Sequence, residues 1–364
     1  MNEAHSNEFD CVFVIGAGAS YEFGLPTGGD LKDLIISTLD DLLNRQGLVD
    51  QLSDAIFSSL GRHTQADEKL AREQCRVIRD GLVFSPSIDN FLHLHRDNEL
   101  LVNIGKLTIA FVILGSERSS TLYVQKDNWQ KESVPQFSKK ADGLHPASTY
   151  LGKIFEDLTV LRGFSEFCER LNRILFISFN YDRCILMFIC FAAKLLYPDA
   201  QYKEDQLFDS IHVLHPYGHL GEISSLHDLK IKFGGGHQLN SNHLLAASKG
   251  IRTFTEGVSE DNVAQSIGEA LSHANLLVFL GYGFLDLNNK ILARADFSQS
   301  IKSVFSTCYM VRNPKQDEIV EFLGGNYRSG VGAGGKYRLS EAIVQNKTCS
   351  DFVEEWRSKF RQHY

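Results

Sequence analysis

The 364-residue sequence lacks several features that would assign a protein to a class directly. Its seven cysteines are scattered, odd in number and never spaced as CxxC, which argues against a disulfide framework and a zinc ribbon. No group of His, Cys or carboxylate residues has the spacing of metal ligands, so we expect no metal. The formal net charge is −8, so a nucleic-acid partner would need a local basic patch.

A long apolar stretch is also missing. The N-terminal residues MNEAHSNEFD are polar and acidic, without the hydrophobic region of a signal peptide. No apolar run reaches the roughly 18 uncharged residues of a spanning helix. We therefore expect a cytoplasmic protein with reduced thiols, neither secreted nor membrane-spanning. Its 43% hydrophobic and 23% charged content is ordinary for a globular protein.

What the sequence does contain is a repeated alternation of strand-like and helix-like segments. Short runs rich in β-branched residues, each followed by glycine or polar residues, are typical of buried parallel strands. They lie at 11–15, 174–182, 210–215, 276–283 and 303–313. Helical spacing follows the first of them, from Leu31 to Leu42. This alternation predicts an α/β fold, a Rossmann-like parallel sheet with helices on both faces.

The length favours one large α/β unit with an insertion. We expect a single domain over 1–364, with its core at 9–45 and 171–314, a helical insertion at 46–170 and a C-terminal cap at 315–364. Within the insertion, SPSIDNFLHLH (85–95) and IGKLTIAFVILGSE (104–117) predict helices, and 119–142 reads as an exposed loop. The cap contains a glycine-rich loop and an amphipathic helix near 349–361.

The stretch VFVIGAGASYEFGLPTGGDL (12–31) combines a strand, a glycine turn and a helix. Such a turn brings backbone N–H groups and a positive helix end to one point, which favours a pyrophosphate. The dinucleotide fingerprint GxGxxG fits poorly, because the glycine after Gly18 is Gly24, and the absence of a following Lys excludes a Walker A loop. The alternative is that Gly16 and Gly18 only form a tight turn.

Five motifs resemble, in order, those of the sirtuin-like superfamily. The first, GAGxSxxxGxP, is matched by Gly16, Ala17, Gly18, Ser20, Gly24 and Pro26. FNYD (179–182) resembles the second motif, LHPYGHLG (214–221) the catalytic histidine segment, FLGYGF (279–284) the late strand beside the nicotinamide-side ribose, and MVRNP (310–314) the closing strand at the adenosine end. The resemblance implies an NAD-binding set of Gly16, Ala17, Gly18, Ser20, Pro26, Thr27, Asp182, Gly281, Tyr282 and Asn313.

Departures from the superfamily pattern distinguish its branches. Histone-deacylase sirtuins have Asp-Phe-Arg after Gly-x-Pro and a four-cysteine zinc module, whereas this chain continues with Thr27 and has no such module. The segments SPSIDNFL, IGKLTIAFVILGSE and IRTFTE are similar instead to bacterial sirtuin-like proteins of antiphage defence. That resemblance implies an NAD glycohydrolase that depletes cellular NAD. It also implies an inactive resting state, a homo-oligomer and a partner protein such as a ring-forming ATPase.

For this reaction, Asn180 and His215 are the candidate catalytic residues. Cleavage of the nicotinamide–ribose bond builds an oxocarbenium-like charge, and the Asn180 amide can donate to a ribose hydroxyl and accept from water. The imidazole of His215 can take a proton from a ribose hydroxyl or the attacking water, with His219 as its rival. Asn180 could instead cap the next helix. Asp182 either anchors the same loop or accepts a ribose hydroxyl.

Several site residues keep two interpretations. Ser20 donates to a phosphate, caps the helix, or does both. Pro26 and Thr27 are expected to shape the loop over the nicotinamide pocket. Gly281 and Gly283 reflect either a close approach to ligand or a turn that needs positive φ. The competing functions are a non-catalytic sensor of NAD or an ADP-ribose-like signal, and a protein deacylase, which the missing zinc module disfavours.

Overall fold

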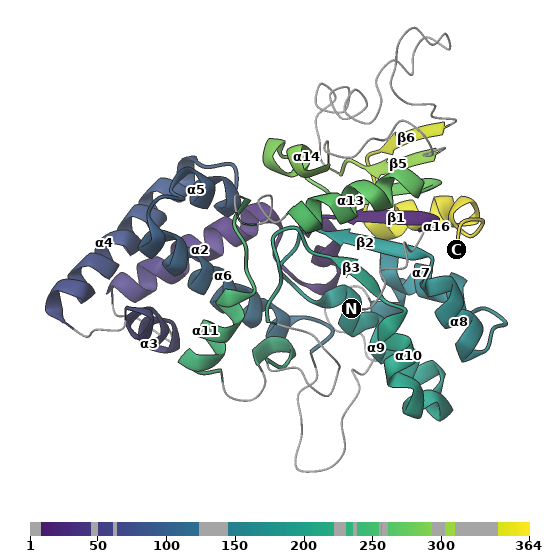
Figure 1. Cartoon of the computed structure of the whole chain (residues 1–364), viewed down its shortest axis with the longest axis horizontal. Coiled ribbons are helices and arrows are strands. Elements are labelled where there is room, and N and C mark those ends of the chain that lie inside the picture. Colours follow the sequence, from purple (N-terminus) through teal and green to yellow (C-terminus); the bar gives the residue numbers. More distant parts are fainter. Residues whose placement is uncertain are drawn as a thin grey trace, which may run out of the picture.

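The computed structural model describes residues 9–44, 50–60, 64–123, 145–221, 231–235, 239–254, 256, 261–292, 303–309 and 341–364. Six parallel strands form one sheet with helices on both faces, which confirms the predicted α/β fold (Figure 1). The strands are β1 (Cys11–Ile15), β2 (Ile174–Ser178), β3 (His212–Leu214), β4 (Leu276–Leu280), β5 (Ser303–Thr307) and β6 (Glu341–Gln345).

The sheet order is β3-β2-β1-β4-β5-β6, the order of dinucleotide-binding Rossmann sheets. The direction of winding reverses between β1 and β4, and open α/β sheets bind ligands in the crevice outside the carboxyl ends of the strands at such a point. Ile15 is in register with Ser178 of β2 and Leu280 of β4. Consequently, the segments after these three strands leave the sheet side by side.

The central strands β1, β2 and β4 are buried along their whole length, as continuous apolar runs in a parallel sheet require. Their side chains alternate between two cores. Val12 and Val14 face a core shared with α13 (Asp261–His273), α14 (Asp286–Leu292) and the helical bundle described below. Phe13 and Ile15 face a second core formed with α7 (Tyr150–Thr159), α8 (Phe164–Leu171), α9 (Cys184–Leu196), α10 (Glu204–Asp209) and α16 (Cys349–Phe360).

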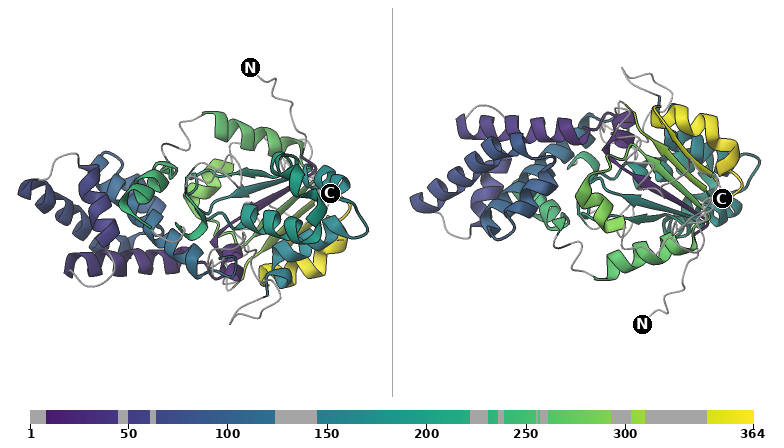
Figure 2. Two further views of the ribbon diagram at one scale, coloured as in Figure 1. Left: turned by 90° about the horizontal axis from the view of Figure 1, so that it is seen from below. Right: turned by 90° about the horizontal axis from the view of Figure 1, so that it is seen from above.

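A helical bundle lies to one side of the sheet, beyond the carboxyl ends of the strands (Figures 1 and 2). Its helices are α2 (Gly28–Asn44), α3 (Asp50–Ser59), α4 (Gln65–Gly81), α5 (Ile88–Leu94), α6 (Glu99–Ser119) and α11 (Ser241–Lys249). The residues expected as one insertion, 46–170, therefore divide between two places. Those up to Ser119 join the bundle, whereas α7 and α8 cover the sheet. The bundle also takes α2 and α11 from outside that range.

Helix α6 is the central helix of the bundle. By length and composition it could cross a membrane, with a mean hydropathy of 1.6, and it is the one such helix in the described part of the chain. However, 61% of the 18-residue apolar stretch in this helix is buried inside the structure, against α2, α3, α4 and α11. Its apolar surface is therefore used for packing within the bundle.

The C-terminal segment contributes more to the sheet than its sequence indicated. The amphipathic helix predicted near 349–361 is α16, and its N-cap Thr348 accepts a hydrogen bond from the Asp351 N–H at 3.2 Å. Before it, β6 pairs with β5 and forms an edge of the sheet, a strand that the sequence did not predict. The predicted glycine-rich loop and most of the loop expected at 119–142 lie outside the described residues.

Candidate functional site

The glycine turn after β1 packs directly on the turn after β4. Gly16, extended at φ −112° and ψ 177°, caps the short helix α1 (Ala17–Ser20). Its N–H donates to the carbonyl oxygen of Leu280 at 3.0 Å, and the Gly18 N–H donates to that of Gly281 at 3.1 Å. A Cβ on Gly16 would lie 2.4 Å from the Gly281 oxygen. The tight-turn interpretation therefore accounts for both glycines, and their N–H groups are occupied by the protein itself.

Gly281 is required by its own conformation and by the same contact. Its φ is +59°, in the left-handed region, and a Cβ there would lie 2.1 Å from the Ala19 nitrogen. Of the two explanations expected for this glycine, a close approach to ligand or a turn that needs positive φ, the positive φ is present. The atoms that approach it, however, belong to the glycine turn of the same chain.

Ser20 occupies the end of α1 and not its start. Neither α1 nor the following η1 (Tyr21–Phe23) has a side-chain cap, so the prediction that Ser20 caps the helix is wrong. Its hydroxyl instead accepts a hydrogen bond from Asn180 Nδ2 at 2.8 Å and also bonds to the Asp182 carboxylate. Ser20 thus links the turn after β1 to the loop after β2.

Asn180 is buried at the end of β2, with 7% of its surface exposed. Its Nδ2 donates to the carbonyl oxygen of Gly16 at 3.0 Å and to the hydroxyl of Ser20 at 2.8 Å, which uses both amide hydrogens. The alternative that Asn180 caps the next helix is wrong, because the N-cap of α9 is Arg183 and makes no side-chain capping bond. The Oδ1 atom has no hydrogen-bond partner within the described residues and is the atom left to accept a bond.

His215 lies next to Asn180. Its Nδ1 is 3.0 Å from the backbone oxygen of Asn180, and since a carbonyl only accepts, Nδ1 carries the proton and Nε2 is left as an acceptor. Burial, with a smaller effect from the nearby ring of His219, lowers the pKa of His215 to about 3, although the hydrogen bond to Asn180 acts in the opposite direction. The imidazole is therefore neutral at physiological pH.

His219 does not contact Asn180 in this way. Its ring centroid lies 5.0 Å from that of His215, and its buried Nδ1 has no hydrogen-bond partner in the described part of the chain. Its backbone N–H donates to Gly250 at 3.1 Å, which fixes the turn after His215. Burial and the charge of Arg183 lower the pKa of His219. Of the two candidate histidines, His215 is the one bonded to Asn180.

Asp182 anchors its own loop. Its Oδ1 accepts a hydrogen bond from the Cys184 N–H at 3.0 Å, and the Ser20 hydroxyl adds a second bond. The side chain is buried, and burial raises the pKa of Asp182 despite these bonds. These contacts correspond to the anchoring role, one of the two roles expected for Asp182.

Two other predicted ligand positions, Thr27 and Tyr282, have structural roles. Thr27 and Asp30 form a reciprocal cap at the start of α2, with the Thr27 hydroxyl donating to Asp30 at 2.7 Å. Tyr282 is buried and its hydroxyl donates to Asn289 at 3.2 Å. Pro26 is half-buried between Leu25 and that cap. Asn313 lies outside the described residues.

Aromatic rings form a layer beneath the strand ends. The rings of Phe179, Tyr181, Tyr217 and Tyr282 lie in a chain with centroid separations of 5.2 to 6.4 Å. Each tyrosine hydroxyl is bonded to a neighbouring side chain, namely Asp89, Asn288 and Asn289 respectively. Sequence reasoning missed this layer, although each of the three motifs after β2, β3 and β4 contains one of its tyrosines.

A buried ion pair lies beside the FNYD loop. Arg183, directly after Asp182, bonds through Nε to Glu117 Oε1 at 3.0 Å, and the two side chains are 1% and 0% exposed. The second Glu117 oxygen also accepts the Gly234 N–H at 2.9 Å. Glu117 belongs to the last turn of α6, so the pair joins the bundle to the sheet edge. No feature of the sequence predicts this pairing across 66 positions.

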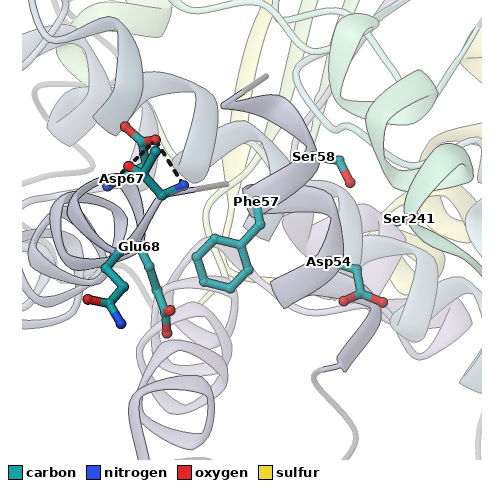
Figure 3. A pocket seen from close by; sticks show the side chains of 8 residues that line it. Asp54, Phe57, Ser58, Asp67, Glu68 and Ser241 are labelled. Atoms are coloured by element: carbon teal, nitrogen blue, oxygen red, sulfur yellow. Dashed lines mark hydrogen bonds between the residues drawn. The ribbon is translucent and has the colours of Figure 1, made fainter. Parts of the chain in front are cut away.

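A pocket among the described residues lies away from this site, between α3, α4 and the start of α11 (Figure 3). Its volume is about 450 Å³, and it shares no residue with the site at the sheet edge. Figure 3 shows the carboxylates of Asp54, Asp67 and Glu68 around Phe57. Asp67 is already used in a capping box with Thr64. Within the described ranges, no group of three or more His, Cys, Asp or Glu residues could hold a metal ion.

Comparison with known proteins assigns no family, because no family model and no curated protein matches the chain. The functional interpretation therefore depends on the fold and on the geometry at the carboxyl edge of the sheet.

Proposed function

We propose that this protein is an NAD glycohydrolase, which cleaves the nicotinamide–ribose bond to give nicotinamide and ADP-ribose. The motifs that resemble the sirtuin-like superfamily suggest this reaction. The sheet order, with its switch point between β1 and β4, is the arrangement in which Rossmann sheets bind dinucleotides.

One observation carries the proposal: the first three motifs form one hydrogen-bonded unit at the switch point. The Asn180 side chain bonds to the glycine turn after β1, and its backbone oxygen bonds to His215 after β3. These segments are separated by 164 and 35 positions in the chain. The two polar groups needed at the scissile sugar are thereby held together.

The chemistry follows from the atoms that these bonds leave open. Loss of nicotinamide leaves positive charge on the ribose, and a water must then attack the anomeric carbon. Asn180 Oδ1 can accept a hydrogen bond from that water or from a ribose hydroxyl, and His215 Nε2 can accept the proton. The Nδ2 group holds the glycine turn in place during the reaction.

The resemblance to the antiphage proteins implies an enzyme that is inactive until triggered, and the proposal includes this resting state. An imidazole with a pKa of about 3 is a weak base at neutral pH. We propose that oligomerisation or a partner protein, such as a ring-forming ATPase, changes this environment. The biological role proposed from the resemblance is that of a cytoplasmic antiphage effector that depletes NAD.

The test is incubation of the purified full-length protein with NAD, alone and together with the products of neighbouring genes, followed by chromatography of released nicotinamide. We expect release under at least one condition. Asn180→Ala and His215→Ala are expected to lower it at least about a hundredfold, the order of magnitude of losing an acid–base group.

The matched control is His212→Ala, since His212 lies on β3 shortly before His215, and the only hydrogen bond of its side chain among the described residues is to Asn172, at 2.6 Å. This variant should cleave NAD as the wild type does. The proposal fails if no condition releases nicotinamide, or if Asn180→Ala retains full release. Thermal melts of all variants show whether a loss reflects unfolding.

A second candidate is a non-catalytic sensor that binds NAD or an ADP-ribose-like signal at the same edge of the sheet. The engagement of both Asn180 amide hydrogens with Gly16 and Ser20 favours it, because a residue in a structural role is bonded in this way. Calorimetric titration with NAD distinguishes the two candidates. Saturable binding with NAD recovered intact under every condition would support the sensor.

A further inference from the structure

Asp89 connects the helical bundle to the candidate site. It lies in the first turn of α5, and its carboxylate accepts a hydrogen bond from the hydroxyl of Tyr181, the residue after Asn180. The two residues are 92 positions apart in the chain. Tyr181 is 4% exposed, so its ring is buried between the bundle and the sheet edge, whereas Asp89 is half-buried.

Tyr181 is bonded at both ends. Its hydroxyl bonds to Asp89, and its backbone oxygen accepts the Leu220 N–H at 3.3 Å. Leu220 belongs to the same turn as His215, and the Asn180 carbonyl directly before Tyr181 accepts from His215. The position of Tyr181 therefore determines how the loop after β2 meets the turn after β3.

The polar groups around Asp89 can donate hydrogen bonds to its carboxyl group. The facing polar groups are the hydroxyls of Tyr181 and Tyr217 from the strand-end loops and that of Ser87 from its own helix. Burial raises the pKa of Asp89 to about 6, while the bonds from Tyr181 and Ser87 act in the opposite direction. Above that pH the ionised carboxylate accepts a charge-assisted bond, which is stronger than one between neutral groups.

We propose that Asp89 is a positioning residue of the site, acting from the bundle through Tyr181 to set the relative placement of Asn180 and His215. This inference rests on the proposed NAD hydrolysis for its catalytic consequence, whereas the positioning contact is testable without it. A displacement of reacting groups by about 1 Å can lower a rate about a hundredfold, so a contact distant from the reacting atoms is sufficient.

The experiment compares Asp89→Ala, Asp89→Asn and Tyr181→Phe with wild type. The control is Asp97→Ala, which removes an exposed carboxylate from the turn after α5. Hydrogen exchange followed by mass spectrometry, without NAD, reports on peptides covering 179–183 and 215–221. Steady-state NAD cleavage, under the condition in which the wild type is active, separates kcat from KM. Thermal melts are recorded for each variant.

Asp89→Ala and Tyr181→Phe are expected to accelerate exchange in both peptides and to lower kcat at least about tenfold, with KM changed by less than about threefold. Asp89→Asn keeps an acceptor oxygen and should retain kcat within about threefold. The Asp97→Ala control should match wild type in both measurements.

The proposal is overturned if Asp89→Ala leaves exchange and kcat at wild-type values, if only KM changes, or if Asp97→Ala has the same effects. Accelerated exchange with unchanged kcat also overturns it, because the contact would then not position the reacting groups. If the wild type cleaves no NAD, the proposed function fails, and the exchange data alone decide whether Asp89 holds the two loops.

Discussion

The Glu117–Arg183 pair gives the clearest stability prediction. Glu117→Gln preserves the shape of the side chain but removes the negative charge opposite a buried guanidinium. The Arg183 side chain is 1% exposed, so water cannot replace the lost carboxylate. The new amide group would also face two donors, the guanidinium and the Gly234 N–H at 2.9 Å.

The magnitude follows from leaving a buried charge without its partner. Breaking such a pair from one side costs about 3–5 kcal/mol in the free energy of unfolding. Native proteins of ordinary stability have about 5–15 kcal/mol in total, so the variant should lose a large part of it. Carbonyl acceptors from residues 231 and 232 still bond to Arg183, which is why we expect the protein to fold.

The assay is urea unfolding followed by circular dichroism, with midpoints compared at equal slope. Glu166→Gln is the matched control, because it makes the same change in an exposed Glu–Arg pair with a separation of 3.0 Å and a 57% exposed carboxylate. That pair should contribute about 0–1 kcal/mol. A Glu117→Gln midpoint no lower than that of Glu166→Gln would refute the reasoning.

Three further predictions concern the turns, the histidine and the C-terminal helix. Gly281→Ala should yield no folded protein by circular dichroism, since its Cβ would lie 2.1 Å from the Ala19 nitrogen at a φ of +59°. His215 is neutral when folded, with a pKa of about 3, and takes up a proton when unfolded near 6.5, so its contribution to stability is present at pH 7 and lost as pH falls. Between about pH 7 and pH 5, the free energy of unfolding of the wild type should therefore fall by about 1–2 kcal/mol more than that of His215→Gln, as measured by urea unfolding. Asp157→Asn should lower the melting temperature and expose α16 to limited proteolysis, because Arg357 loses a fully buried carboxylate.

The sequence identified the sheet well because buried parallel strands have a strong local pattern. The run Cys11–Ile15 is a strand at the expected bounds. The strands β2 to β5 each lie inside one of the other four expected ranges. The range 174–182 was too long, because the chain leaves the sheet after Ser178 to form the FNYD loop. β6 was missed because it is a five-residue edge strand without a continuous apolar run.

Helix placement was less accessible to sequence reasoning. Amphipathic periodicity shows that a helix buries one face, but it does not show which surface covers that face. Thus α7 packs on α16 through Asp157 and Arg357, while α6 packs within the bundle, although both fall in the range expected as one insertion. The choice depends on contacts between residues about 200 positions apart.

At the site, motif positions predicted which segments would meet, but not the bonds between them. Ser20, expected at a phosphate or as a cap, bonds to Asn180 and Asp182. Thr27, expected over a ligand pocket, caps α2 with Asp30. A hydroxyl or amide can satisfy several partners, and its choice depends on which neighbour the fold brings within about 3 Å.

The glycines of the opening motif are explained by contacts within the chain, so their presence alone does not indicate a ligand. Gly16 and Gly18 adjoin Gly281, and each would clash with or crowd the other turn if it carried a side chain. The polar groups are different, because an amide oxygen and an imidazole nitrogen that no neighbouring side chain occupies are open to a hydrogen bond from water or a ligand. Asn180 Oδ1 and His215 Nε2 have no partner within the described residues, whereas their neighbouring nitrogens are bonded. A turn with only a structural role would need neither of these two acceptor atoms. Both lie at the point where a Rossmann sheet binds its ligand.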